Sequence, residues 1–320
     1  MQHALTQYRR QIMRYYFAPL EGLTDHIFRQ THHKHFPGVH RYYTPFFSPT
    51  VHRSLTAREA RELPPSDSLG YKVVPQLLTK VADDFIWMHQ QCADLGYSEV
   101  NLNLGCPSGT VTAKGKGSGM LIDTDALDRF LDTVFHQAVV DISVKTRIGF
   151  QAPEEFPQLL EIFNQYPIKE LTVHPRVRNT FYSGHVDLDV FTYCLKNSKN
   201  PVCYNGDLRS LSDISECIKR FPTLDAVMLG RGLIADPGML TPGGTTVQKL
   251  EAFHEELLSQ YLHAFGGSRN AMFRLKEHWG MLINRFEGSE KLWKEIRKTT
   301  DLQQFVQLTK QVFHTLPLIR

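Results

Sequence analysis

The residue best suited to chemistry is Cys106, which lies between a glycine and a proline directly after the apolar segment Glu99–Leu104. A short turn of this kind holds a thiol in a rigid, accessible position, where it can act as a nucleophile or as a proton donor. The chain has five cysteines, of which the others are Cys92, Cys194, Cys203 and Cys217. An odd number without a C-x-x-C pair is typical of reduced thiols in the cytoplasm, not of a disulfide framework or a zinc site.

Four further polar side chains end other apolar segments. Lys145 and His174 close two of them, and Gln76 and Asn103 lie near the ends of two more. A lysine beside an electron-rich ring can stabilise negative charge that develops on reduction. Amide groups can donate to and accept from the edge of a heterocycle. The alternative is a surface lysine and a hydrogen-bonded core histidine, which the apolar character of both segments disfavours.

Two glycine-containing segments, Asn205-Gly206-Asp207 and Gly230-Arg231-Gly232, have the composition of a phosphate site. Glycine lets backbone N–H groups approach phosphate oxygens closely, and arginine can add a charge-assisted contact. Each glycine alone can equally make a tight turn, but the two segments together favour phosphate binding. No metal-binding motif is present, so we expect no metal site.

These residues need a scaffold that brings the ends of many strands together. Eight short apolar or β-branched segments recur about every 30 residues, with helical periodicity between most of them. They are Tyr15–Ala18, Val39–Tyr43, Lys72–Leu77, Glu99–Leu104, Ile142–Thr146, Glu170–His174, Pro201–Asn205 and Ala226–Gly230. The order predicts an α/β fold, a (β/α)8 TIM barrel, in which function lies at the carboxyl ends of the strands. A doubly wound sheet is the alternative, and Pro45–Ser68 is expected to be a loop.

The pattern changes after Pro242-Gly243-Gly244. Residues 245–316 lack a strand signal and show helical periodicity in four segments. These segments are 247–265, Met272–Phe286, Lys291–Thr299 and Leu302–Leu316. We therefore predict two domains, a barrel over residues 1–242 and an all-α helical bundle over residues 243–320.

Composition narrows the class of protein. With 42% hydrophobic and 22% charged residues, extensive disorder is excluded. No apolar run reaches the roughly 18 residues of a membrane span, and none precedes Tyr15 to indicate a secretory signal. We expect a cytoplasmic monomer with no membrane partner. The formal net charge of +3 arises in residues 245–320, which hold 11 basic and 8 acidic residues.

Together these segments resemble the tRNA-dihydrouridine synthase family, flavin-dependent enzymes that reduce uridine in RNA. The most specific element is Asn-Leu-Gly-Cys-Pro at 103–107. Further segments occur in the family's order: Ala18–Asp25, Lys145–Arg147, Val173–Arg176, Asn205–Asp207 and Gly230–Gly232. Glu21 and Arg274-Leu275-Lys276 are most similar to the C-type bacterial branch. The chain departs from the family at Pro175, where glycine is common, and at Tyr204.

The resemblance implies FMN as the cofactor and NADPH as a transient reductant. It implies a barrel that binds FMN and a helical domain that binds RNA. Cys106 would be the general acid that protonates C5 of uracil while hydride reaches C6. The expected cofactor-binding residues are Pro19, Leu20, Glu21, Gln76, Lys145, His174, Asn205, Gly206, Asp207, Gly230 and Arg231. The expected substrate-binding residues are Asn103, Arg176, Arg274, Lys276 and His278.

The predicted helix Met272–Phe286 has a basic face, on which Arg274, His278 and Arg285 are near whole turns apart. Beside an RNA-modifying barrel, such a face favours phosphate contacts over simple solvation. The target base, most simply in a tRNA, has to leave its stack to reach the barrel. Three alternatives stay open: the same reaction on ribosomal RNA, an FMN barrel that reduces a small enone or dihydropyrimidine, and a non-catalytic RNA-binding protein that retains a barrel.

Overall fold

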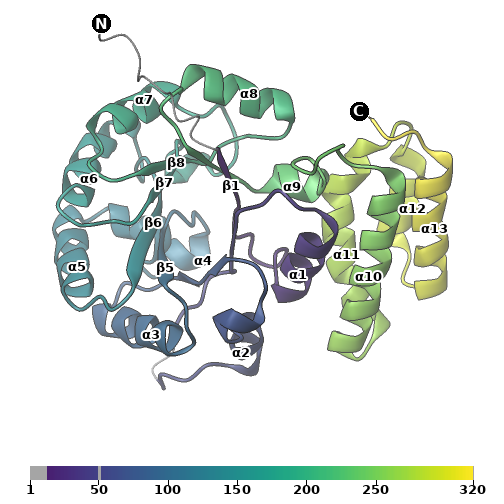
Figure 1. Ribbon diagram of the computed structural model, residues 1–320, viewed down its shortest axis with the longest axis horizontal. Helices are drawn as coiled ribbons and strands as arrows, with labels where there is room; N and C mark the ends of the chain where they lie inside the picture. Colours follow the sequence, from purple (N-terminus) through teal and green to yellow (C-terminus); the bar gives the residue numbers. More distant parts are fainter. Residues whose placement is uncertain (1–12, 50–51, 320) are drawn as a thin grey trace, which may run out of the picture.

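The computed structural model describes residues 13–49 and 52–319. Strands and helices alternate through the first part of the chain, and helices alone follow (Figure 1). The expectation that the chain lacks a secretory signal concerns residues 1–12, which lie outside the described residues.

The strands form one sheet in which every pairing is parallel. Their order is β3-β2-β1-β9-β8-β7-β6-β5-β4. The bounds are β1 Arg14–Phe17, β2 Arg41–Tyr43, β3 Val73–Val74, β4 Gln76–Leu77, β5 Glu99–Leu104, β6 Asp141–Arg147, β7 Leu171–His174, β8 Val202–Tyr204 and β9 Ala226–Leu229.

A single proline joins the two ends of this order. β3 pairs with β2 and β4 pairs with β5, and only Pro75 separates β3 from β4. Proline has no backbone N–H for the ladder, so the strand is interrupted there. The carbonyl of Pro75 still accepts from the Asn101 N–H at 2.8 Å. β3 and β4 thus occupy one strand position, and the eight positions close into the predicted barrel.

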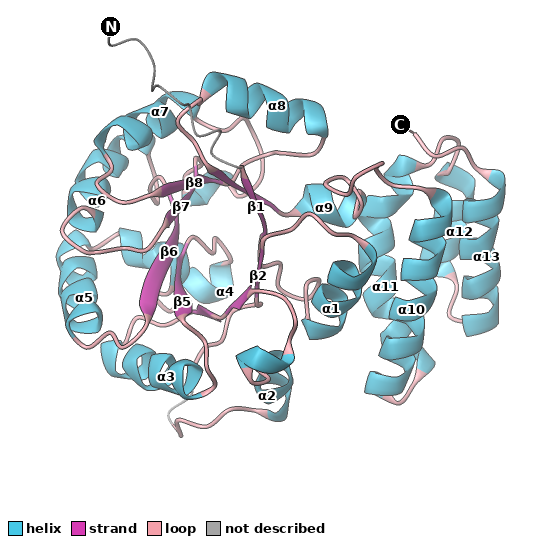
Figure 2. Cartoon of the chain, in the orientation of Figure 1, coloured by secondary structure: helices cyan, strands magenta, loops and turns pink. Residues whose placement is uncertain are grey.

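Most helices of this part surround the strands on the outside of the ring, whereas α4 lies within the outline of the ring in this view (Figure 2). Their bounds are α1 His26–His35, α2 Ala57–Glu62, α3 Ala82–Asp94, α4 Gly109–Thr112, α5 Thr124–His136, α6 Phe156–Phe163, α7 Leu188–Asn197, α8 Leu211–Arg220 and α9 Arg231–Ala235. Short 3-10 turns are η1 Ser66–Ser68, η2 Gly117–Leu121, η3 Pro153–Glu155 and η4 Arg178–Thr180. Helix α5 illustrates the packing, since it buries Leu127, Phe130, Leu131 and Val134, which share one helical face.

The expectation of a loop over Pro45–Ser68 is wrong in part, because this segment contains α2 and η1. A capping box begins α2: the Thr56 hydroxyl accepts from the Glu59 N–H, and the Glu59 carboxylate accepts from the Thr56 N–H. Thr-x-x-Glu is a recognisable start signal, although the six residues that follow are too few to show helical periodicity.

The last part of the chain is helical, as predicted. α10 Val247–Phe265, α11 Ser268–Leu282, α12 Glu290–Lys298 and α13 Leu302–Thr315 are joined by short connections, with η5 Ile283–Arg285 after α11. Trp279, Phe305 and Phe313 are buried among them. α10 packs on α1 of the barrel, and α11 packs on α9 (Figure 1). Within the described residues, no helix is both long and apolar enough to cross a bilayer.

Candidate active site

A cavity of about 370 Å³ opens at the carboxyl ends of the strands. Thirteen residues expected in the site line it: Pro19, Leu20, Glu21, Gln76, Asn103, Cys106, Lys145, His174, Asn205, Gly206, Asp207, Gly230 and Arg231. They come from seven of the eight strand positions around the ring. The lining residues that were not expected include Arg147, Tyr182 and, from α11, Met281.

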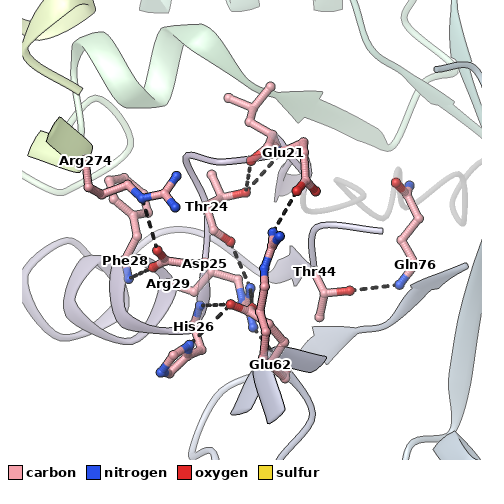
Figure 3. A network of polar contacts seen from close by, with 12 residues as sticks. Glu21, Thr24, Asp25, His26, Phe28, Arg29, Thr44, Glu62, Gln76 and Arg274 are labelled. Atoms are coloured by element: carbon pink, nitrogen blue, oxygen red, sulfur yellow. Dashed lines mark hydrogen bonds and ion pairs between the residues drawn. The ribbon is translucent and has the colours of Figure 1, made fainter. Parts of the chain in front are cut away.

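A chain of amides holds the Cys106 turn. The Gln76 amide donates to Asn101 Oδ1 at 2.8 Å, and Asn103 Nδ2 donates to Gln76 Oε1 at 2.8 Å. The Asn103 Oδ1 atom accepts from the backbone N–H groups of Gly105 and Cys106, at 3.0 and 2.9 Å. The backbone N–H of Gln76 also donates to the Thr44 hydroxyl, at 2.9 Å (Figure 3). Asn103 therefore positions Cys106, and the second hydrogen of its amide has no acceptor among the residues that the structure describes.

The glycine-rich segment after Cys106 packs beneath it. The Cys106 carbonyl accepts from Ser118 N and Oγ, at 3.2 and 2.8 Å. Gly117 has φ +60°, and a Cβ there would lie 2.9 Å from the Cys106 carbonyl oxygen. Glycine is thus required for close approach of the two segments. Burial raises the pKa of the Cys106 thiol above its ordinary value of 9.0, so the thiol keeps its proton at neutral pH.

Arg147 fastens the Cys106 turn to the loop after β7. Its guanidinium donates to the carbonyls of Gly105 at 3.0 Å, Val177 at 2.8 Å and Phe181 at 2.6 Å. Burial lowers the pKa of Arg147 to about 10, which leaves it charged at neutral pH. The sequence signal was its place two residues after Lys145, since alternate residues of a strand point the same way.

Lys145 and His174 place one charged and one neutral nitrogen group on the cavity wall. Burial, with a smaller effect of Arg147, lowers the pKa of Lys145 to about 8. Nothing in the described ranges forms a hydrogen bond or ion pair with its ammonium. Burial and the surrounding cations hold the pKa of His174 well below 6.5. Its Nε2 accepts from the Arg176 guanidinium at 3.1 Å, because arginine can only donate, so Nδ1 carries the proton.

Arg176 lies behind the cavity, not in it. It is 3% exposed and donates to the carbonyls of Ser183 and Gly184 and to the Asp207 carboxylate. Burial acts to raise the pKa of Asp207, but Arg176, together with Arg209 and Arg231, outweighs it and the pKa is lowered. The donors of Arg176 are thus used within the protein, and the expected substrate contact stays an untested prediction.

Packing requires two of the three glycines in the expected phosphate segments, Gly206 and Gly232, whereas a Cβ at Gly230 would make ordinary contacts at 3.4 Å or more. A Cβ at Gly206 would lie 2.8 Å from Val186 Cγ1, and one at Gly232 would lie 2.3 Å from the Leu208 carbonyl oxygen. Arg231 Nη2 donates to Asp207 Oδ1 at 3.3 Å, and Arg231 Cζ lies 4.8 Å from the Tyr182 ring centroid. Close packing thus accounts for glycine at positions 206 and 232 but not at 230, and phosphate binding by these loops stays a prediction.

The basic face of α11 contacts the barrel. Arg274 pairs with Asp25 at 3.7 Å (Figure 3), and His278, 5% exposed, donates to the Leu23 carbonyl at 2.8 Å. Arg285 pairs with Asp236 at 3.3 Å. The prediction that this face contacts RNA phosphates stays untested, but the structure shows that all three side chains contact the barrel. Helical spacing alone cannot tell whether a face meets water, RNA or a neighbouring domain.

Lys276 is also used within the protein. Its ammonium donates to the carbonyls of Thr299 and Arg297 at the end of α12. Of the expected residues on α11, Arg274 alone lines an open groove. Since Leu23 and Asp25 follow the cavity residues Leu20 and Glu21, α11 supports the loop that forms one side of the cavity.

A parallel barrel with a thiol, a lysine and amides around a cavity at its carboxyl edge defines a barrel enzyme, here with an appended helical domain. The family described as dihydrouridine synthase (Dus) matches residues 16–316. The chain belongs to this family. The resemblance and the predicted enzyme class, a flavin-dependent synthase of dihydrouridine, are thereby confirmed.

Curated relatives agree with this assignment. A probable tRNA-dihydrouridine synthase 1 of Synechocystis is 26% identical, covering 94% of this chain and 86% of the relative. A tRNA-dihydrouridine(16) synthase of Vibrio vulnificus is 25% identical, covering 92% of this chain and 96% of the relative. A solved morphinone reductase variant in complex with tetrahydroNAD has a TM-score of 0.51 at 10% identity, covering 71% of this chain and 85% of that one. The last likeness shows the barrel fold alone.

Proposed function

We propose that this protein reduces a uridine of folded RNA, in a tRNA, to 5,6-dihydrouridine, with FMN as cofactor and NADPH as reductant. The observation that carries the proposal is the Cys106 thiol, held in the cavity by Asn103 and Ser118 and kept protonated by burial. The names of the curated relatives support tRNA as the substrate. We further propose the C-type branch, on Glu21 and Arg274-Leu275-Lys276.

The cavity residues fit a flavin. A volume of about 370 Å³ lies in the range of about 300–1,000 Å³ usual for cofactor sites. Pro19 and Leu20 would contact the apolar rings. Lys145, whose ammonium has no hydrogen-bond or ion-pair partner in the described part of the chain, would compensate negative charge on them. Gln76, His174 and Asn205 offer polar groups to the ring edges and the ribityl chain. Arg231 would meet the phosphate, because Arg176 already neutralises Asp207 beside it.

When bound, FMN supplies the hydride that reduces C6 of the uracil. The residues of this chain supply the rest. Cys106 holds its proton until transfer to C5, since burial opposes formation of the thiolate. Asn103 fixes the position of that thiol through two backbone N–H groups and keeps one amide hydrogen for the base. Arg147 restrains the same turn from the side of β7.

We also propose that the chain has two domains, of which residues 1–242 bind the cofactor and residues 243–320 help to bind the RNA. The protein would act as a monomer in the cytoplasm. The five free cysteines are compatible with a reducing compartment.

The function is tested by NADPH oxidation. The purified protein is expected to carry FMN and to oxidise NADPH in a manner that depends on an unmodified tRNA transcript. Dihydrouridine should accumulate in that transcript in proportion to the NADPH consumed. Oxidation that needs no RNA and proceeds with a small enone would assign the barrel to the alternative substrate class. A protein without reducible flavin would contradict enzymatic activity altogether.

The pH dependence of FMN binding should report on Lys145. Free Lys145 is protonated below a pKa of about 8, so affinity is expected to be constant below that pH. Above it, binding of a cofactor that favours the ammonium requires proton uptake, and affinity should fall by up to about tenfold per pH unit. Fluorescence titration between pH 7 and 9 measures this. Lys145→Met should bind FMN more weakly, and its affinity should not change with pH. If the affinities of the variant and of the unaltered protein change with pH in parallel, Lys145 is not the titrating group.

A further inference from the structure

A second concave site lies beside the active-site mouth. We call it the α10–α11 groove, a space of about 380 Å³ lined by Gly22, Phe265, Asn270, Phe273, Arg274 and Glu277. Gly22 directly follows Glu21, which lines the main cavity. The groove is thus continuous in sequence and in space with the loop that forms one wall of the active site.

Two phenylalanines expose their rings in this groove. Phe273 is 68% exposed, the highest value among the large hydrophobic residues that the structure describes as exposed, and Phe265 is 38% exposed. Single exposed apolar side chains are ordinary on protein surfaces. Two of them in one concave site next to the active-site cavity are not ordinary, because apolar side chains that gather on a surface mark a site of interaction.

Phe265 is held as part of a rigid stack. Its ring lies parallel to that of Tyr261, with centroids 5.4 Å apart and an interplanar angle of 5°. The buried Tyr261 donates its hydroxyl hydrogen to Asp25 at 3.0 Å. One face of the Phe265 ring is therefore covered by Tyr261, and the remaining surface of the ring faces the groove. Because the ring is already held in place, it loses little conformational freedom when another flat group packs on it.

The polar groups of the groove suit a nucleobase edge better than a phosphate. Asn270 carries an amide donor and acceptor, Arg274 carries guanidinium donors, and Glu277 adds an acceptor. Arg274 is oriented by its pair with Asp25 at 3.7 Å, as Figure 3 shows. The Glu277 carboxylate would repel a phosphate but can accept from the amino or imino groups of a base.

We propose that the α10–α11 groove binds an unstacked nucleobase of the substrate RNA, close to the uridine that enters the cavity. The inference rests on the proposed function, because extrusion of one base into the barrel leaves neighbouring bases unstacked. Phe273 and Phe265 supply the stacking surface, which tolerates any base. Asn270, Arg274 and Glu277 face the edge of that base.

Replacement of Phe273 provides the test. Phe273→Ala is expected to raise the Kd for an unmodified tRNA transcript by about 5- to 100-fold, the effect of one lost aromatic–base stack. The slope of log Kd against log salt should not change, because no phosphate contact is removed. FMN content and thermal unfolding should match the unaltered protein, since the side chain is exposed. Phe273→Trp should restore the affinity, whereas Phe273→Leu should not, because leucine is apolar but has no π-face.

Tyr193 offers a matched control, since it is 38% exposed on α7, on the opposite side of the molecule from α11 (Figure 1). Tyr193→Ala should leave the Kd for RNA unchanged. An unchanged Kd in Phe273→Ala, with tRNA still reduced, would overturn the groove proposal and leave the proposed function intact. If, without RNA, the unaltered protein sediments as a dimer and Phe273→Ala sediments as a monomer, the groove binds a second copy of this chain and the groove proposal is overturned. Failure of the unaltered protein to bind or reduce tRNA would remove the proposed function itself.

Discussion

Cys106→Ala is expected to lower the rate of dihydrouridine formation by about 10²- to 10⁴-fold, the usual contribution of a positioned general acid. The alanine variant retains every backbone contact that holds the turn, because Asn103 and Ser118 bind backbone atoms of residue 106. FMN content and reduction of the flavin by NADPH should therefore be unaffected. Single-turnover reduction of an unmodified tRNA transcript, followed by mass spectrometry of the nucleosides, measures the loss.

Two companion variants sharpen this result. Cys106→Ser keeps a proton of much lower acidity and should recover only part of the rate. Cys217→Ala removes a thiol from α8, away from the cavity, and should behave as the unaltered protein. If Cys106→Ala reduces uridine at the full rate, the proton reaches C5 from another donor and the assigned role is lost.

Arg176→Met should have the second large effect, on flavin retention and stability rather than on RNA affinity. The buried guanidinium holds His174 Nε2, the Asp207 carboxylate and two loop carbonyls. Without Arg176, the Asp207 carboxylate loses its buried cationic partner and lies uncompensated beside the position expected for the phosphate. We expect a loss of about 2–4 kcal/mol in unfolding free energy, since Asp207 is only partly buried, and protein that is purified without most of its FMN.

A double-mutant cycle separates charge from packing. Adding Asp207→Asn to Arg176→Met removes the unpaired charge and should restore part of both stability and FMN content. Urea unfolding and the flavin-to-protein absorbance ratio are the measurements. If Arg176→Met keeps its flavin and stability but binds tRNA poorly, Arg176 is a substrate contact after all.

The sequence was sufficient to predict the barrel because its strands recur as short apolar segments with the right spacing. β5 has the predicted bounds, and the split of the third strand at Pro75 is visible in the sequence as a proline within a strand segment. The cavity lining was also predictable, since polar residues at strand ends meet at one edge of a parallel barrel.

The contacts that the sequence did not predict have a common physical origin in the packing of segments against one another. Arg176, Lys276 and His278 are polar residues whose types suit RNA binding, yet each is used for a carbonyl or carboxylate contact within the protein. Helical spacing placed Arg274, His278 and Arg285 on one face, but it could not show which surface that face contacts. Arg147 was missed for the same reason, because its three carbonyl partners lie 30 or more residues away.

The most direct test of the account maps dihydrouridine, position by position, in tRNA and ribosomal RNA from cells with and without the gene. We predict that one tRNA position loses dihydrouridine in its absence, that the unaltered gene restores it, and that the gene encoding Cys106→Ala does not. Unchanged dihydrouridine at every tRNA position, or restoration by the Cys106→Ala gene, would contradict the account.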